Sequence, residues 1–455
     1  MKKTRILAMI LCLCMTLALV ACGGGNNKPA NDKPANNAPA TETEKKEETK
    51  DPAPAPAGDA KLSGDLEVGI LNAEGTTAYD IITTYCGQAL MDENPDLNIT
   101  YTFANTKARS FMDQRWRSND APDTDYFVYN AQIPSTHEFT DYLLDLTPYL
   151  AEDGWGDSFI ESAEAVTNLN GATYGVVTDT HILGLYYNKD YFDQYNIAPP
   201  ATWDDLVAAC ETLKSNGIDP IAVTGTYAPY MGSWLDHLMM REVGYEAAND
   251  AIRSATMSEN AGVRRAVEKV KVLIDNGYLL KGFEGTDFTA VQMQFFQGQA
   301  GMILMGTWLT SEMADSIPED FNLGFCPFPT VDGGEGDPGE TLAHSNIMAI
   351  NKDSENLDAA IAYLKKLTSV EVQTVRTEKT GIVSAVKGVP APEGVFGLNE
   401  AIEAAETLRV RHFAMELEAD RNTAYYNEVA KLFMGEYKTV DEFLAGADAA
   451  MALLK

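Results

Sequence analysis

The residues best suited to catalysis in this sequence are a serine, an aspartate and a histidine that lie close together in the chain. Ser233, Asp236 and His237 are the residue types of a hydrolase triad. A triad is assembled in space, however, so closeness in sequence is weak support for one. The chain also lacks a G-x-S-x-G motif, which would place a serine nucleophile on a sharp turn. Nucleophilic catalysis therefore has little support.

Carboxylates are abundant, but their number follows from the overall composition. The 455 residues include 67 Asp and Glu against 34 Lys and Arg, a formal net charge of −33. A pair of carboxylates could flank a glycosidic bond, so a glycoside hydrolase stays open as an alternative. The acidic balance argues against binding nucleic acid or anionic membranes through a basic surface. A solvated acidic surface is the preferred interpretation.

Metal and disulfide chemistry have no matching pattern. The five histidines are scattered and form no H-E-x-x-H motif, so zinc catalysis is unsupported. Cys86, Cys210 and Cys326 are isolated, and we expect them to be buried small apolar groups, with at most one disulfide among them. The acidic, glycine-rich loop 332–337 lacks the spacing of an EF-hand and is interpreted as a turn. No metal and no cofactor are expected.

The N-terminal segment has the features of an export signal. Three basic residues precede an apolar run from Ile6 to Val20, which is too short for a comfortable membrane span. Leu19-Val20-Ala21-Cys22 resembles a lipobox, which implies removal of residues 1–21 and lipidation of Cys22; a plain secretory signal is the alternative. Several acyl chains on Cys22 would anchor the protein, since each buried methylene contributes about 0.8 kcal/mol.

A tether is predicted after the signal. From Gly23 to Ala60 the chain has no Val, Ile, Leu, Met or aromatic residue, so it cannot offset its ordering entropy by burial. As a flexible coil, these 38 residues would span on the order of 35 Å. Residues 61–455 are then too many for one ordinary core and suggest two domains.

The folded part alternates between strand-like and helical patterns. Strands are expected at 67–71, 98–103, 125–129, 183–187, 221–224 and 302–305, and helices at 76–94, 106–118, 189–195, 263–274 and 359–367. The alternation predicts an α/β architecture with largely parallel sheets. Thr202, with Asp205 three residues later, has the signature of a capping box that opens a further helix.

Three segments have distinctive motifs. Gly184–Phe192 contains the pattern "YN-K-D-hydrophobic-F", and Pro199–Leu206 contains "P-x-T-W-x-(D/E)-L". Phe295–Trp308 is similar to "F-x-x-G-(K/Q)-A-A-M…G-x-W". Together these segments resemble bacterial extracellular solute-binding protein family 1, whose members are sugar ABC-transporter substrate-binding lipoproteins similar to maltose-binding protein. Shorter matches follow in the family's order at Gly324–Pro329, Ile350–Lys352 and Gly381–Ala385.

The resemblance implies a type II periplasmic-binding-protein-like fold with discontinuous lobes joined by hinge crossovers. Crossovers are expected near Thr178–Leu185, Leu342–Ala349 and Val386–Pro392. Lobe one then takes residues 62–182 and 345–388, and lobe two takes 183–344 and 389–455.

The resemblance also implies which residues contact a ligand. A sugar needs flat aromatic surfaces for its C–H faces and planar polar side chains for its hydroxyls. The family commonly stacks the tryptophan of "G-x-W", here Trp308, on the sugar. The other expected ligand contacts are Trp234, Tyr230, Tyr129, Asn130, Glu74, Asp179, His181 and Asn346. Trp203 and Tyr187 belong to the signature, but we expect them to pack in the interior.

The implied function is capture without chemistry. A receptor of an ABC importer would close around a solute, which we expect to be a mono- or oligosaccharide, and deliver it to permease transmembrane subunits. Such a protein is expected to be a lipid-anchored monomer on the extracytoplasmic face of the cell membrane and not an enzyme. The alternatives are a lipid-anchored extracellular glycoside hydrolase and a lipoprotein that presents ligand to a sensor. Sugar acids, amino sugars, polyol phosphates and polyamines stay open as ligands.

Overall fold

The computed structural model describes residues 61–103, 109–128, 139–160, 167–314, 316–404, 407–410, 417 and 419–454. Cys22, the predicted tether, Tyr129 and Asn130 lie outside these ranges. The described residues all lie within one compact unit. Within the described ranges, no helix combines the length and apolar character needed to cross a membrane.

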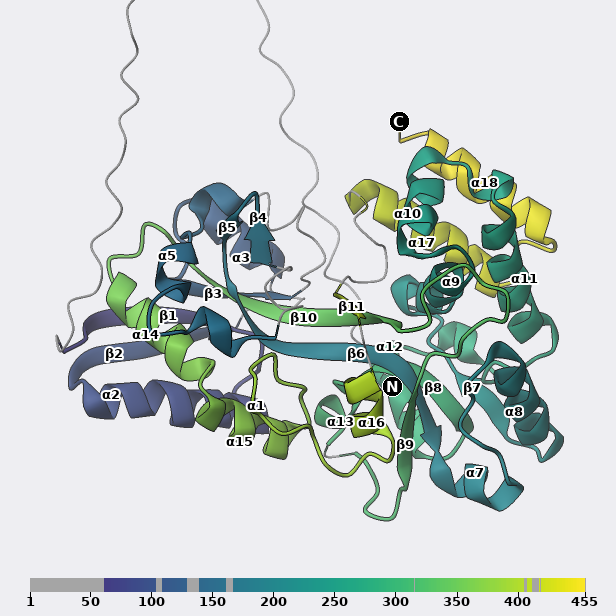
Figure 1. Cartoon of the computed structure of the whole chain (residues 1–455), viewed down its shortest axis with the longest axis horizontal. Helices are drawn as coiled ribbons and strands as arrows, with labels where there is room; N and C mark the ends of the chain where they lie inside the picture. The colour runs from purple at the N-terminus through teal and green to yellow at the C-terminus, as the bar shows by residue number, and fades with distance from the viewer. Residues whose placement is uncertain are drawn as a thin grey trace, which may run out of the picture. The chain divides into compact units, whose positions relative to one another are not determined.

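The elements alternate as the sequence predicts (Figure 1). The strands are β1 Ser63–Ile70, β2 Asp96–Phe103, β3 Thr124–Val128, β4 Asn168–Leu169, β5 Ala172–Thr173, β6 Val176–Asn188, β7 Asp219–Ala222, β8 Ala300–Gly306, β9 Leu323–Pro327, β10 Glu340–Ile350 and β11 Thr407–Val410. The helices are α1 Thr77–Ile81, α2 Ala89–Glu93, α3 Arg109–Arg117, α5 Thr147–Leu150, α7 Lys189–Tyr195, α8 Trp203–Ser215, α9 Ala228–Val243, α10 Tyr245–Ser254, α11 Ala261–Asp275, α12 Phe288–Phe296, α13 Leu309–Glu312, α14 Leu357–Leu367, α15 Val370–Thr380, α16 Leu398–Ala404, α17 Ala419–Phe433 and α18 Val440–Ala452. A π-helical segment, Ile82–Gln88, joins α1 to α2.

The strands form a mixed sheet in the order β2-β1-β3-β10-β6-β8-β7, with β11 beside β10 and β9 beside β6. The pairs β1–β2, β1–β3, β7–β8 and β10–β11 are parallel. The prediction of largely parallel sheets is wrong, because the two central strands run against their neighbours. β10 is antiparallel to β3 and β6, and β6 is antiparallel to β8 and β9.

The long strand β6 links two sets of strands. Residues 176–182 of β6 pair with β10, whereas residues 183–188 pair with β8 and β9. All 13 residues of β6 and all 11 of β10 are buried. β6 and β10 contain the two segments where the first and second crossovers are expected, and Figure 1 shows both strands running through the middle of the structure.

The local signals around the signature are confirmed. The Asn188 side chain accepts from the backbone N–H groups of Asp190 and Tyr191, so β6 passes directly into α7. The capping box at the start of α8 is complete, because Thr202 and Asp205 each bond the other's backbone. Helix α11 ends just before Gly277, which adopts a φ of +59°.

The interior contains most of the aromatic residues of the signature. Tyr187 is 2% exposed and Trp203 is 9% exposed, as expected for packing residues. The thiols of Cys86, Cys210 and Cys326 are free and buried, which confirms their interpretation as small apolar groups.

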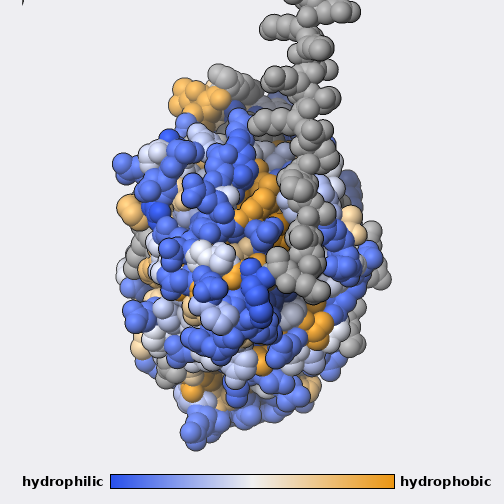
Figure 2. Space-filling model, turned by 90° about the vertical axis from the view of Figure 1, so that its left-hand side faces the viewer, coloured by the Kyte–Doolittle hydropathy of each residue, from blue (hydrophilic) through white to orange (hydrophobic). Residues whose placement is uncertain are grey.

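The outside is different in character. Figure 2 shows a face covered mainly by hydrophilic side chains with scattered hydrophobic ones, in keeping with a formal net charge of −33.

A buried carboxyl group ties α9 to α17. Asp236 is fully buried, and its two oxygens accept from the hydroxyls of Tyr425 and Tyr426, each at 2.8 Å. Burial raises the pKa of Asp236 to about 8, and the two tyrosine hydrogen bonds offset only part of that effect. The carboxyl group is therefore largely protonated at neutral pH in the folded protein.

We expect Asp236→Asn to flatten the pH dependence of stability. An unfolded Asp has a pKa of about 3.9, so the raised folded pKa removes stability progressively as the pH rises from about 4 to about 8. The amide mimics the protonated acid and has no charge to bury. Melting temperatures of the parent and the variant measured between pH 4 and pH 9 should diverge in favour of the variant as the pH rises.

The exposed residue Asp332 offers a matched control, because Asp332→Asn removes a carboxylate that is not buried. That variant should follow the parent curve. Parallel curves for the parent and Asp236→Asn would contradict a raised pKa at Asp236.

Candidate functional site

A run of polar residues lies in the middle of the buried strand β6. Thr178, Asp179, Thr180 and His181 occupy consecutive positions opposite the polar segment of β10. Thr180 Oγ1 lies 3.0 Å from Ser345 Oγ across the two strands. Polar side chains at the centre of a sheet need partners, since an unpaired polar group loses its water without compensation. The partners of these residues define the site.

Asp179 is the centre of this polar cluster and is 2% exposed. One carboxylate oxygen accepts from Thr178 Oγ1 at 2.8 Å, Arg376 Nη2 at 3.0 Å and Tyr126 OH at 3.3 Å. The other accepts from Asn346 Nδ2 at 2.5 Å and from His181 Nε2 at 3.0 Å. The carboxylate is therefore surrounded by donors from β3, β6, β10 and α15.

The charge of Asp179 is stabilised by these donors. Burial by itself would raise its pKa, but the Arg376 guanidinium and the hydrogen bonds from His181 and Asn346 hold the pKa well below its usual range. Arg376 is itself 6% exposed and also donates to the Thr178 carbonyl at 3.0 Å. The two residues form a buried ion pair, and the Thr178 carbonyl is a further partner of the guanidinium.

His181 connects this cluster to the end of β8. Its Nδ1 lies 3.3 Å from Thr307 Oγ1, and the Thr307 N–H donates to the Ile182 carbonyl at 3.1 Å. The imidazole meets the indole of Trp308 edge to face, with ring centroids 5.4 Å apart and planes at 81°. The polar cluster thus extends directly to an aromatic side chain.

Trp308 is half-buried and begins a chain of aromatic contacts. Its ring lies 5.4 Å from that of His344 and 6.2 Å from that of Tyr230. Tyr230 continues to Phe288 at 4.4 Å and to Tyr227 at 5.3 Å. Tyr227 is 38% exposed, so the chain of rings runs from the polar cluster to the surface. Such a surface can stack against flat apolar faces of a ligand.

Gly306 explains the spacing of the "G-x-W" motif. A Cβ atom at residue 306 would collide with the six-membered ring of Trp308, which lies directly over the glycine. The indole therefore folds back over the end of β8, and only a residue without a side chain permits this position. The position of the indole ring therefore requires a glycine two residues before the tryptophan, which explains the motif on steric grounds.

Comparison with known proteins decides the family. Residues 71–374 match the bacterial extracellular solute-binding protein family. The chain belongs to this family. Two relatives are a multiple sugar-binding protein of Streptococcus mutans, 24% identical over 49% of this chain and 53% of the relative, and an uncharacterised ABC transporter extracellular-binding protein of Pyrococcus horikoshii, 25% identical over 54% of this chain and 56% of the relative. The chain thus spans about half the length of these curated relatives.

A solved structure shows the fold of this solute-binding protein. A chitin oligosaccharide binding protein superimposes with a TM-score of 0.74 over 86% of this chain and 98% of its own, at 23% identity. The chain therefore has the two-domain, type II periplasmic-binding-protein fold that the sequence predicts.

Five of the residues expected to contact ligand in this solute-binding protein are brought together. Asp179, His181 and Asn346 form the polar cluster, and Trp308 and Tyr230 lie in the adjoining chain of rings. Asp179 is not positioned as a ligand contact, because both of its carboxylate oxygens face protein donors inside the sheet. Its place is behind the surface that Trp308 helps to form.

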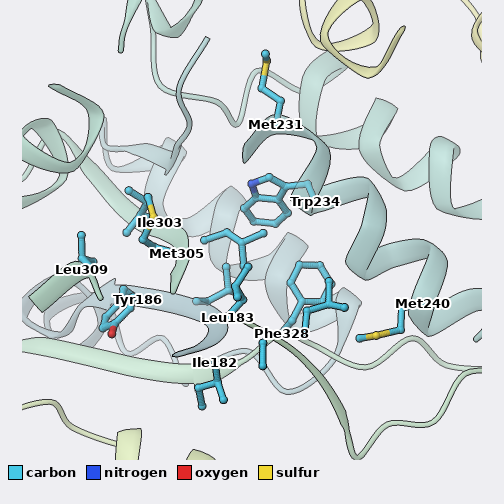
Figure 3. Packing of buried hydrophobic residues seen from close by; sticks show 14 of the residues in the cluster. Ile182, Leu183, Tyr186, Met231, Trp234, Met240, Ile303, Met305, Leu309 and Phe328 are labelled. Atoms are coloured by element: carbon cyan, nitrogen blue, oxygen red, sulfur yellow. The ribbon is translucent and has the colours of Figure 1, made fainter. Parts of the chain in front are cut away.

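The other expected contacts lie elsewhere. Trp234 is 1% exposed and packs edge to face on Phe328, 5.7 Å away, within the core shown in Figure 3. Glu74 is exposed in the turn after β1. Tyr129 and Asn130 lie outside the described residues. Trp234 is therefore left out of the site that we propose.

Sequence reasoning missed Glu312 as a site residue. Its backbone N–H donates to the Trp308 carbonyl at 2.8 Å, which places it one helical turn beyond the indole. Its carboxylate accepts from Nε2 of the buried Gln292 at 3.2 Å, and burial raises the pKa of the group. A spacing of four residues after Trp308 was the available signal, but the other acidic residues in the chain hide it.

A cavity of about 260 Å³ lies apart from this cluster, between α5, β5 and the first residues of β6. Its lining contains none of the expected ligand contacts. We locate the candidate site at Trp308 instead, because aromatic surface and anchored polar groups occur together there.

We expect Arg376→Leu to lower the free energy of unfolding by about 3–5 kcal/mol, because it leaves the Asp179 carboxylate buried without a countercharge. The double substitution Asp179→Asn with Arg376→Leu should cost less than Arg376→Leu alone. Denaturant titration measures both. A double variant less stable than the single one would show that the carboxylate does not depend on Arg376.

Proposed function

We propose that this protein is the solute-binding receptor of an ABC importer and that it captures a carbohydrate. The half-buried indole of Trp308 carries the proposal. Together with Tyr230, Phe288 and Tyr227 it forms a continuous aromatic surface beside an anchored carboxylate. This combination matches the apolar faces and hydroxyl rims of sugars. The Streptococcus mutans relative is a multiple sugar-binding protein and the structural neighbour is a chitin oligosaccharide binding protein, which supports the same ligand class.

The capture step is closure of two lobes on the ligand. We assign lobe one to residues 62–182 and 345–388 and lobe two to 183–344 and 389–455. The crossing strands β6 and β10 support this division, because each exchanges its pairing partners along its length. A ligand favours the closed state only through contacts that it gains on closure. The closed receptor then docks on the permease transmembrane subunits and releases the sugar.

Hydrolysis is less well supported by the arrangement of Ser233, Asp236 and His237. The Ser233 hydroxyl donates to the Tyr230 carbonyl at 2.7 Å, and His237 Nδ1 donates to the Ser233 carbonyl rather than to its hydroxyl. Asp236 is bound to two tyrosines. All three residues are buried in α9 and serve its packing.

A thermal-shift screen tests the ligand class. The panel would contain chitin oligosaccharides, raffinose, maltose and galactose, with spermidine and glycerol phosphate as non-sugar ligands. A sugar that binds only the folded protein raises its melting temperature by mass action. A shift with a non-sugar ligand and none with any sugar would overturn the carbohydrate assignment. Product analysis of the same mixtures separates binding from turnover.

We expect Trp308→Ala to weaken binding of the best sugar of the panel by about 10-fold or more, because it removes the stacking surface. The fold should be retained, since the ring is only half-buried. Calorimetry measures the affinity. Tyr85→Ala, which removes an aromatic ring 45% exposed on the helical segment between β1 and β2, is the matched control and should bind as the parent does. An unchanged affinity in Trp308→Ala would remove the residue from the site.

We further propose that the receptor is a lipoprotein anchored through Cys22 on the extracytoplasmic face of the cell membrane. The lipobox-like sequence supports this assignment, and the tether from Gly23 to Ala60 would hold the folded part away from the lipid surface.

Cys22→Ala should move the protein from the membrane fraction of expressing cells to the medium or the soluble fraction, because the acyl chains would have no attachment point. Immunoblotting of the fractions measures the distribution. Cys86→Ala, at a buried thiol, is the control and should leave the protein with the membrane. Equal membrane retention in Cys22→Ala would contradict the anchor.

A further inference from the structure

We propose that Asp179 and His181 are positioning residues that set the orientation of the Trp308 indole. This inference rests on the proposed function, in which Trp308 is the stacking surface for a sugar. It assigns Asp179 and His181 an indirect role in recognition, in place of the direct ligand contacts that the family resemblance implies.

The first step is that Asp179 has no free oxygen to offer a ligand. Five donors surround the carboxylate, and the residue is 2% exposed. A ligand hydroxyl could reach it only by displacing one of these donors, and the displaced group would then be buried without a partner. Asp179 therefore acts through the groups that it holds.

The second step is that Asp179 fixes the tautomer of His181. A carboxylate only accepts, so His181 Nε2 carries the proton of the 3.0 Å bond. In the neutral ring Nδ1 is then an acceptor, and the hydroxyl of Thr307 lies 3.3 Å from it. Both ring nitrogens are engaged, one to β6 and one to the residue before Trp308. The imidazole cannot turn without losing one of these bonds.

The third step is that a second route leads from Asp179 to the same indole. Asn346 donates to Asp179 through Nδ2 and presents Oδ1 to His344 Nε2 at 3.3 Å. His344 lies 5.4 Å from Trp308, ring centroid to ring centroid, and His181 lies at the same distance. The two imidazoles that border the indole are thus oriented from one carboxylate.

The other rings that neighbour Trp308, those of Tyr230 and His344, belong to α9 and β10. Gly306 gives the ring room to fold back over β8, and Tyr230 meets it edge to face at 6.2 Å. Tyr230 belongs to α9, whereas His181 is hydrogen-bonded within the central strands. Removal of the His181 ring would leave the indole without its ring contact on the β6 side.

The test uses the full chain labelled with 5-fluorotryptophan and requires no ligand. Trp308→Phe identifies the Trp308 signal among the five tryptophan signals in the ¹⁹F spectrum. His181→Leu fills the space but cannot bond Asp179, and it should shift or broaden the Trp308 signal while the other four stay in place. His181→Gln retains a donor for Asp179 and should restore much of the parent signal.

A parent-like Trp308 signal in His181→Leu would overturn the proposal, as would equal disturbance by the leucine and glutamine variants. A general loss of signal dispersion in the leucine variant would indicate unfolding, and the glutamine variant alone then decides. Because no sugar is present, a negative screen for sugar binding leaves this result intact, so failure of the positioning role and failure of the proposed function are distinguishable.

Binding of the panel sugar that raises the melting temperature most gives a second readout. One aromatic contact corresponds to about a 2- to 10-fold change in affinity, so His181→Leu should weaken binding by that factor in the parent. In the Trp308→Ala background the same substitution should have almost no further effect, since there is no indole left to orient. Equal effects in both backgrounds would mean that His181 acts independently of Trp308.

Discussion

The ion pair between Asp179 and Arg376 is the constraint on which the centre of this protein depends. Two charges that leave water together lose several kcal/mol of hydration each, and only close and complete pairing offsets that loss. Here the pairing draws on side chains from β3, β6, β10 and α15 at once. The charge of Asp179 is therefore fully compensated only when all four elements are in place, so the pair links the stability of these elements to one another.

The same constraint determines where recognition can occur. A carboxylate saturated by protein donors fixes the groups around it, and those groups continue through His181 to Thr307 and Trp308. Rigid polar residues thus lie behind an aromatic surface that is only half-buried. Binding sites depend on such supporting residues, because a ring that is free to tilt must be ordered when a ligand binds. The free-energy cost of that ordering reduces the gain from stacking.

Local signals predicted much of the fold. The helix Lys189–Tyr195 and the capping box of α8 depend on neighbours in sequence, so their residues can be read directly. The mixed character of the sheet could not be predicted, since strand direction in β6 and β10 depends on partners more than a hundred residues away. Burial was equally hard to judge for Trp234, because the surrounding sequence does not show whether a tryptophan of helix α9 faces the core or a ligand. Glu312 could not be singled out, because the sequence contains 67 Asp and Glu residues and nothing in it distinguishes this one.

One glycine allows the helix that carries Arg376 to pack closely against the short helix that follows Trp308. Gly381 ends α15, the helix that carries Arg376, with a φ of +69° that favours glycine. A Cβ atom there would lie 2.7 Å from Thr310 Oγ1 in α13, the short helix that follows Trp308 and includes Glu312. A side chain at residue 381 would therefore press against the Thr310 side chain. The helix that carries Arg376 and the short helix that includes Glu312 thus approach each other closely at this glycine.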